Sequence, residues 1–330
     1  MEVGLLFGSG LKFPEMLEAA KSADSSGLDA VFTSELAVRD AFTPLGAFAA
    51  ATERVKLGTG IVSIFTRSPV TTGMTAATLD EMSGGRMVLG LGTSPPFYIQ
   101  GWHSTPFERP LTRMKEFVQI VKKVVAGERL NFQGKVFRSK GFQLAFQPPR
   151  KDLPVLVAGV GPRMIEAAGE VADGVFLPPL LCPEYLEFAR KHLEIGARRA
   201  GRKTVPKLVS MPITSIAADR KTAIKQARPN VAFYSIVYYY KWVIEAGGFG
   251  HLHGAIRETN KSKGMMAAEK LIPDEMVDKV AICGTPEECW AKLEDYGKRG
   301  LGLAVCYPPM LGNAKGGTKA ILEMAKKFRG

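Results

Sequence analysis

Short β-branched, apolar runs alternate with longer segments of helical periodicity along the chain. The apolar runs predict eight strands, at residues 2–7, 29–33, 55–63, 86–91, 154–158, 174–177, 207–216 and 301–307. The periodic segments predict helices after these strands, at residues 13–25, 44–52, 69–82, 111–126, 162–171, 183–199 and 316–328. Helix 69–82 has the clearest boundaries, because Pro69 occupies its first position and Gly84-Gly85 follow its end.

Eight such units are the number in a closed parallel barrel. Near-continuous apolar strands indicate a parallel sheet covered by helices, so the chain is predicted to be α/β, a single (β/α)₈ TIM barrel domain over residues 1–330. An open, doubly wound sheet is the alternative. Its usual G-x-G-x-x-G fingerprint is incomplete here, since Gly8-Ser9-Gly10 lacks the third glycine.

Two segments lie outside the eight predicted strand–helix units. Residues 131–144 alternate around two glycines and predict a small hairpin before strand 5. Residues 217–300 form a helical insertion between strands 7 and 8, with an apolar stretch at 231–244, a loop at 247–253 and a helix at 286–296. That helix opens with a capping box in which Thr285 is the N-cap and Glu288 lies three positions on.

Composition narrows the class of protein. Of 330 residues, 46% are hydrophobic and 23% charged, which is ordinary for a globular protein. No apolar run reaches the length of a membrane span and no signal peptide is visible, so we expect a cytoplasmic protein without a membrane partner. The four cysteines are irregularly spaced and are predicted to be buried free thiols.

The net charge of +12 raises the question of a polyanionic partner. Its basic residues are scattered and form no recognisable nucleic-acid motif, so we expect no nucleic acid partner. A surface that attracts a small polyanion accounts better for the excess.

Candidate chemistry gathers where the predicted strands end, because a barrel binds its ligands at the carboxyl ends of its strands. The sharpest pattern is Gly159-Val160-Gly161-Pro162-Arg163, a glycine-rich turn that leads directly into a helix. Free backbone N–H groups at that helix start, with the Arg163 guanidinium, would suit a phosphate. An ordinary turn with a surface arginine is the alternative.

Other chemical motifs are sparse. His251 and His253 form an H-x-H pair without a third ligand of matching spacing, so no metal site is predicted. The sequence also contains no G-x-S-x-G, H-E-x-x-H or Walker pattern. A barrel with a phosphate turn and no nucleophile motif indicates that a cofactor performs the chemistry.

Several segments together resemble the bacterial luciferase-like superfamily. They are K-L-G-T-G-I-V at 56–62, T-R-S-P at 66–69, L-D-E-M-S-G-G-R-M-V-L-G-L-G at 79–92, the stretch 154–174 and G-T-P-E-E at 284–288. Within that superfamily the chain is most similar to the methylenetetrahydromethanopterin reductases and their relatives, which use the deazaflavin coenzyme F420. The likeness extends from end to end.

The resemblance implies a barrel that holds coenzyme F420, or alternatively FMN, at its C-terminal mouth. A third-strand bulge at Gly60-Ile61, with a non-proline cis bond, would press on one face of the ring system. The pyrimidine edge would face Gly92 and Thr93. The phosphate-bearing tail would lie on the turn formed by Gly159, Val160, Gly161, Pro162 and Arg163.

Two positions differ from the related enzymes. Leu6 stands where the reductases carry an acidic residue, and Ser34-Glu35 stand where many deazaflavin enzymes have Asp-His. Glu35 is therefore the predicted acid/base or substrate-orienting residue. The alternative is a salt bridge between Glu35 and Arg39.

The leading hypothesis is an F420-dependent oxidoreductase that transfers a hydride between the deazaflavin and a small organic substrate. The alternatives are an FMN-dependent monooxygenase and a non-catalytic flavin-binding barrel. The apolar stretch 231–244, which holds four tyrosines, further predicts a homo-oligomer, either a dimer or a tetramer.

Overall fold

Eight parallel strands pair in a closed ring. The computed structural model describes residues 1–35, 37, 39–311 and 313–330. The ring strands are β1 (Glu2–Phe7), β2 (Ala30–Thr33), β3 (Lys56–Thr59), β5 (Met87–Gly92), β8 (Val155–Ala158), β9 (Gly174–Leu177), β10 (Lys207–Ser210) and β13 (Leu303–Cys306). Each pairs with the next in the chain, β13 pairs with β1, and β3 also pairs with β5. The predicted (β/α)₈ barrel is confirmed, and the open-sheet alternative is wrong.

The chain divides into two compact units. One comprises residues 32–176 and 192–207, and the other comprises residues 1–31, 177–191 and 208–330. All the site residues predicted from the sequence belong to the first unit. The expectation of a single domain with an insertion stays a prediction.

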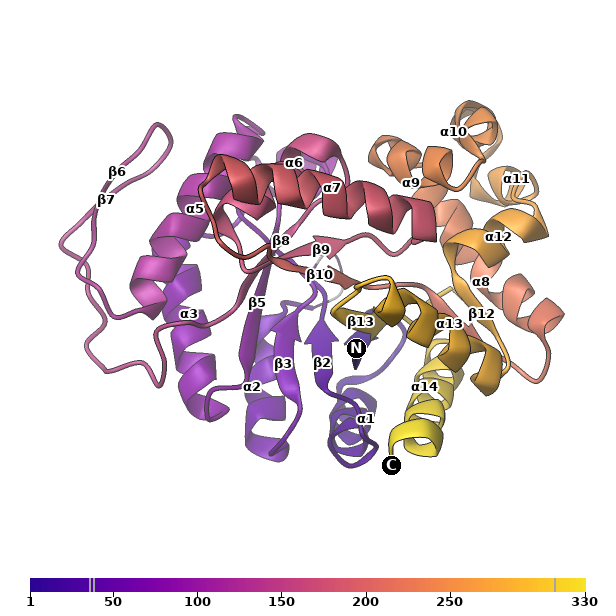
Figure 1. The fold of residues 1–330 in the computed structure, drawn as a ribbon, viewed down its shortest axis with the longest axis horizontal. Helices are drawn as coiled ribbons and strands as arrows, with labels where there is room; N and C mark the ends of the chain where they lie inside the picture. The colour runs from indigo at the N-terminus through magenta and orange to yellow at the C-terminus, as the bar shows by residue number, and fades with distance from the viewer. Residues whose placement is uncertain (36, 38, 312) are drawn as a thin grey trace. The chain divides into compact units, whose positions relative to one another are not determined.

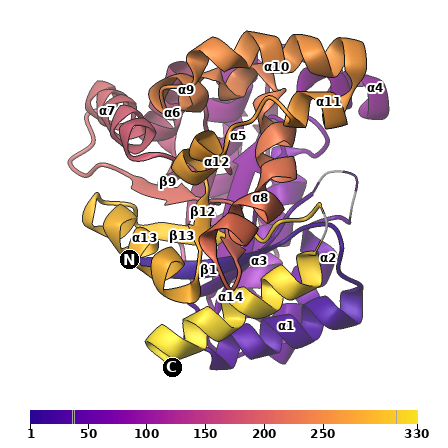
Figure 2. The ribbon, with the colours of Figure 1, turned by 90° about the vertical axis from the view of Figure 1, so that its right-hand side faces the viewer.

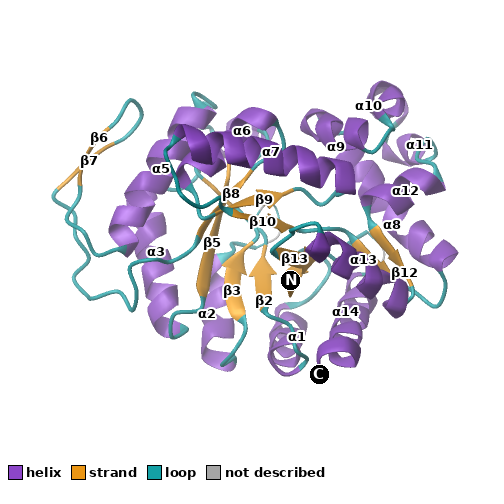
Figure 3. Cartoon of the chain, in the orientation of Figure 1, coloured by secondary structure: helices purple, strands orange, loops and turns teal. Residues whose placement is uncertain are grey.

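The first unit has its strands on the inside and its helices outside them (Figures 1 and 3). Its helices are α2 (Phe42–Ala51), α3 (Pro69–Met82), α4 (Pro96–His103), α5 (Pro110–Val125) and α6 (Pro162–Val171), followed by the end of α7 (Pro183–Arg199). Helix α3 has its predicted bounds, because the Ser68 side chain accepts the Thr71 N–H at 3.0 Å and Gly84 and Gly85 have positive φ.

The predicted hairpin is present and is anchored to the body of this unit. Strands β6 (Asn131–Gln133) and β7 (Arg138–Lys140) pair antiparallel at the left of Figure 1. The Glu116 carboxylate on α5 accepts the backbone N–H groups of Lys135, Val136 and Phe137 at 2.6, 2.9 and 2.9 Å. One buried side chain therefore fixes the turn of the hairpin.

The second unit contains α1 (Phe13–Ser25) and α14 (Ala314–Arg329), which lie side by side in Figure 2. The insertion is helical, as predicted. It consists of α8 (Arg220–Ser235), the 3₁₀ turn η1 (Tyr238–Tyr240), α9 (Lys241–Ala246), α10 (Gly250–Lys263), α11 (Met265–Glu269), α12 (Asp274–Val280) and α13 (Pro286–Lys298). The capping box of Thr285 and Glu288 is confirmed.

Two expectations about this unit are wrong. The predicted strand 207–216 is broken, because Pro212 has no N–H for a ladder, and β11 (Thr214–Ile216) instead pairs with β12 (Ile282–Gly284) in a separate sheet. The predicted loop 247–253 ends early, since α10 begins at Gly250 and buries His253 and Ile256 on one face.

Two global features follow from the described residues. None of the described helices is both long and apolar enough to cross a bilayer. All four cysteines are free and buried, as predicted.

Candidate functional site

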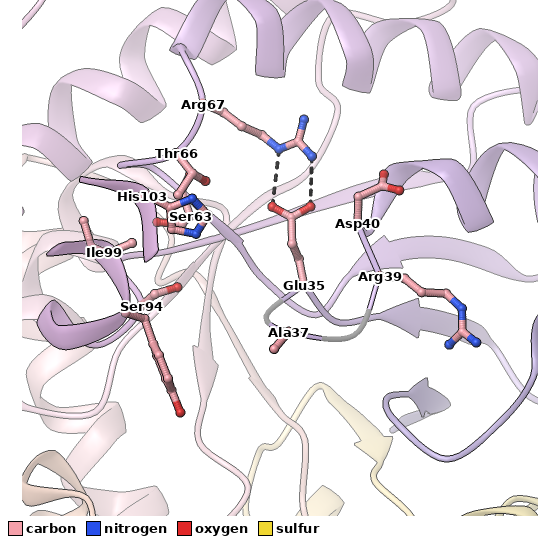
Figure 4. Close-up of a pocket in the computed structure, with 11 residues that line it drawn as sticks. Glu35, Ala37, Arg39, Asp40, Ser63, Thr66, Arg67, Ser94, Ile99 and His103 are labelled. Carbon is pink, nitrogen blue, oxygen red and sulfur yellow. Dashed lines mark hydrogen bonds and ion pairs between the residues drawn. The ribbon is translucent and has the colours of Figure 1, made fainter. Parts of the chain in front are cut away.

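A cavity of about 550 Å³ opens within the first unit, beyond the carboxyl ends of β2 and β5. Its volume suits a small organic ligand. The lining residues come from the segments after β2, around β4 (Val62–Ser63) and after β5 (Figure 4). They are Glu35, Ala37, Arg39, Asp40, Ser63, Thr66, Arg67, Ser94, Tyr98, Ile99 and His103.

Glu35 is held by an arginine that the sequence did not single out. Its carboxylate accepts Nη2–H of Arg67 at 2.9 Å and Nε–H at 3.4 Å, and it also accepts the Ala41 N–H at 3.0 Å (Figure 4). The Arg67 guanidinium lies 4.9 Å from the centroid of the Phe42 ring. This two-pronged pair favours a substrate-orienting role for Glu35 over proton transfer.

Arg39 and Asp40 line the same cavity. Arg39 points away from Glu35 in Figure 4, so its expected pairing with Glu35 stays a prediction. Asp40 is engaged at the start of α2, where Oδ1 accepts the N–H groups of Phe42 and Thr43 at 3.1 and 2.9 Å.

The predicted third-strand bulge is visible in the strand register. Gly58 pairs with Val88 and Val62 pairs with Leu91, so four steps on one strand match three on the other. The extra residue falls between β3 and β4, where the Gly60 N–H donates to the Thr33 carbonyl at 2.6 Å. The bulge at Gly60-Ile61 is confirmed.

The cis bond expected at Gly60-Ile61 is wrong. The described residues contain no cis peptide bond. The physical reason is that the extra residue already offsets the ladder against β5, so an all-trans backbone makes the turn.

The structure brings Ile61 and Gly92 together. A side chain at Gly92 would meet the Ile61 side chain at 2.9 Å, so only glycine leaves room for it. Ser63 and Thr93 are joined nearby, where the Ser63 hydroxyl donates to the Thr93 carbonyl at 3.4 Å. Ile61 is half-buried and, like Gly92, is not among the residues that line the described cavity.

Helix α4 brings two further groups into the cavity, Tyr98 and His103. The sequence reasoning missed this helix, although Pro95-Pro96 ahead of an aromatic run was a usable signal. Ser94, just before it, has φ of 55° and Ser104, at its end, has φ of 51°. Both are left-handed conformations that non-glycine residues rarely adopt.

The glycine-rich turn lies at the end of the strand next to β5. Leu91 pairs with Val157 of β8, so Gly159, Val160 and Gly161 follow the strand that neighbours Gly92 and Thr93. Pro162 opens α6 and Arg163 is exposed. This turn is not part of the described cavity lining, so the predicted phosphate site there stays a prediction.

The residues present fit an anionic, flat ligand such as a deazaflavin or a flavin. The two acidic groups of the cavity are already engaged with Arg67 and with backbone N–H groups. The remaining lining carries guanidinium, imidazole and hydroxyl groups, which suit oxygen-rich anions, although Arg67 is paired with Glu35 and Ser63 donates to the Thr93 carbonyl. The surface of Ile61 beside Gly92 suits an apolar ring face.

Comparison with known proteins agrees with the resemblance seen in the sequence. The model of the luciferase-like monooxygenase family matches residues 2–302. A protein of Mycobacterium tuberculosis, provisionally named a coenzyme F420-dependent oxidoreductase, is 31% identical over 307 residues, which cover 86% of this chain and 88% of that protein. The 5,10-methylenetetrahydromethanopterin reductase of Archaeoglobus fulgidus is 30% identical over 319 residues, covering 94% of each chain.

The fold agrees with a solved structure of the same kind. The coenzyme F420-dependent tetrahydromethanopterin reductase of Methanopyrus kandleri superposes with a TM-score of 0.87 at 23% identity. The superposition covers 100% of this chain and 99% of that one. The match extends over the whole barrel and its insertions.

Proposed function

This chain belongs to the luciferase-like monooxygenase family, and from that premise we propose that it is a coenzyme F420-dependent oxidoreductase acting on a small organic substrate. That it is an enzyme of the oxidoreductase class follows from its relatives. The choice of F420, the transfer of a hydride and the kind of substrate are the proposal.

The observation that carries the proposal is the donor set of the cavity. Its acidic groups are engaged within the protein, Glu35 with Arg67 and Asp40 with backbone N–H groups, and guanidinium, imidazole and hydroxyl groups line the remainder of about 550 Å³. F420 bears phosphate and carboxylate groups on its tail, and the chain carries a net charge of +12. Both features favour an anionic cofactor.

When bound, F420 supplies the hydride chemistry. The residues of this chain bind and orient it. Ile61, fixed against Gly92, would contact the ring face, and the amides at the start of α6 with Arg163 would hold the phosphate. Glu35 keeps the Arg67 guanidinium directed into the cavity. Holding both reactants side by side supplies much of the lowering of the barrier.

Binding measurements with two cofactors test the proposal. Purified protein is titrated separately with F420 and with FMN, and we expect F420 to bind at least about tenfold more tightly. Tighter binding of FMN, with oxygen consumption by the reduced complex, would support the monooxygenase alternative. Binding of F420 without turnover of any carbonyl, alcohol or imine would support the non-catalytic barrel.

We also place the enzyme in the cytoplasm. Four buried, unpaired thiols are typical of a reducing compartment. Secretion of the protein with any of these thiols oxidised in its native host would contradict this placement.

A further inference from the structure

We propose that His103 is the residue that exchanges a proton with the substrate. The proposal rests on the proposed function, because it assigns a role within the same cavity. It deepens that function, since it names a proton partner that the sequence did not suggest. It also concerns a residue on α4, an element that was not predicted.

The carboxylates of the cavity are engaged elsewhere. Glu35 accepts two N–H groups of Arg67 and the Ala41 N–H, at 2.9 to 3.4 Å. Asp40 accepts two backbone N–H groups at the start of α2. A carboxylate that already serves as the acceptor of a guanidinium or of helix amides is poorly placed to carry a proton to a substrate.

The other titratable groups that line the cavity are Arg39, Arg67, Tyr98 and His103. A guanidinium stays protonated in proteins and cannot deliver a proton. Among side chains only histidine ordinarily changes its charge between about pH 5 and 8, and phenols lie outside that range. His103 is therefore the group in the described lining whose ring nitrogens can both donate and accept a proton.

The backbone around α4 gives a second, independent observation. Ser94 and Ser104 flank the helix with φ of 55° and 51°, a left-handed conformation that non-glycine residues rarely adopt. Buried Ile99 anchors the helix, and the Thr105 hydroxyl donates to the His103 carbonyl at 3.0 Å. A left-handed residue therefore bounds each side of the helix that carries His103, and Ile99 packs that helix into the first unit.

The proton step balances as follows. Bound reduced F420 would supply a hydride equivalent to the carbon of a carbonyl or imine, whose oxygen or nitrogen would then need one proton. The N–H bond of the His103 imidazolium breaks, the new O–H or N–H bond forms, and neutral imidazole remains to be reprotonated by water. In the oxidative direction the same imidazole accepts that proton.

The first test does not depend on knowing the substrate. The chain has four histidines, so labelling their Cε1 positions gives four NMR signals, and His103→Asn identifies one of them. Saturation with F420 is expected to move the His103 signal and to leave those of His192, His251 and His253 in place. A His103 signal that does not move at saturation would overturn the proposal.

The second test uses acetone and 5,10-methylenetetrahydromethanopterin as probe substrates with reduced F420. With whichever probe the wild type reduces, His103→Asn should lower kcat by about 10²-fold or more while KM and F420 affinity change less than about threefold. The control is His251→Asn, on exposed α10, which should change nothing. Added imidazole should restore part of the activity of His103→Ala.

The outcomes separate the two proposals. If FMN binds in place of F420, the cofactor assignment fails, and the role of His103 stands if His103→Asn then lowers turnover with reduced FMN and is overturned if it does not. If F420 binds and His103→Asn keeps full turnover, the role of His103 fails and the proposed function stands. If neither cofactor binds, both are overturned.

Discussion

The Glu35 carboxylate and the Arg67 guanidinium form a two-pronged ion pair, with Nη2 and Oε2 2.9 Å apart, at the wall of the candidate site. Glu35 follows β2 and Arg67 precedes α3, so the pair ties two neighbouring barrel loops together. Their side chains are 17% and 27% exposed, which leaves the pair only partly screened by water.

Breaking the ion pair of Glu35 with Arg67 should lower the stability of the protein more than its catalytic rate. We expect Glu35→Gln to lower the free energy of unfolding by about 1–2 kcal/mol, measured by urea denaturation. Asp295→Asn, which breaks the exposed pair of Asp295 with Arg299, is the control and should leave the free energy of unfolding nearly unchanged. Unchanged stability with kcat reduced about 10²-fold would instead identify Glu35 as the acid/base residue.

Lowering the pH should weaken the contact that anchors the β6–β7 hairpin to Glu116 on α5. Burial raises the pKa of Glu116, but the N–H groups of Phe137, Val136 and Lys135 outweigh it and hold the pKa below its ordinary value. A depressed folded pKa stabilises the protein above the unfolded pKa, and this stability is lost as the pH falls through the folded value. The protection of these three amides against hydrogen exchange, taken relative to the intrinsic rate at each pH, should therefore fall as the pH drops below about 4.

The control for this prediction is Glu116→Gln. An amide cannot hold three N–H donors as a carboxylate does, so the variant should show fast exchange in the hairpin already at pH 7. Exchange rates in the variant that match the wild type at pH 7 would mean that Glu116 does not anchor the hairpin.

Helix α7 packs closely against α6 at Gly196, where there is no room for a side chain. A Cβ at Gly196 would overlap the Glu166 carbonyl oxygen, a backbone atom that cannot move aside without shifting α6. We expect Gly196→Ala to destabilise the protein by about 2–3 kcal/mol in thermal unfolding. Gly254→Ala on α10, with open space around its Cβ, should be neutral or slightly stabilising.

Several elements were predictable because their signals are local. The bounds of α1, α3, α6, α7 and β9 agree with the sequence, since proline, glycine and apolar periodicity mark them within a few residues. The break in the predicted strand 207–216 was also readable, because Pro212 cannot join a ladder.

The site was predictable only in part, because long-range pairing leaves no local trace. The bulge at Gly60-Ile61 came from a family resemblance, and the register confirms it. The partner of Glu35 lies 32 residues away, so periodicity could not reveal it. His103 reached the cavity through α4, whose short length and proline-rich start resemble a loop in the sequence.

Exposed aromatic side chains on the insertion lead us to expect that copies of the chain associate. Val231 and Ile244 are buried in their own unit, but Tyr238 and Tyr239 are 51% and 46% exposed. Large exposed aromatic side chains of this kind favour an interface. Light scattering should give a dimer or tetramer, and a 35.8 kDa monomer at micromolar concentration would contradict it.

Substitutions on the insertion test whether Tyr238 and Tyr239 form the expected contact between copies of the chain. Tyr238→Ser combined with Tyr239→Ser should shift the protein toward the monomer. Met266→Ser removes an 82% exposed side chain from nearby α11 and should leave the assembly intact. An equal effect of both variants would mean that the tyrosines are not a specific contact.

The last prediction concerns the positive charge of Arg163 at the glycine-rich turn. Arg163 is exposed one residue after Pro162 opens α6, so its guanidinium can add to the amides of the helix start in holding a phosphate. Arg163→Ala should weaken F420 binding by about 1–3 kcal/mol at low salt, measured by fluorescence titration. Because exposed charges are screened, the loss of affinity should shrink as ionic strength rises.

The matched control is Arg138→Ala, which removes an exposed arginine from the hairpin of the same unit and should not change the affinity for F420. If Arg163→Ala also binds F420 with wild-type affinity at low salt, Arg163 is an ordinary surface residue, and the backbone amides must hold the phosphate alone.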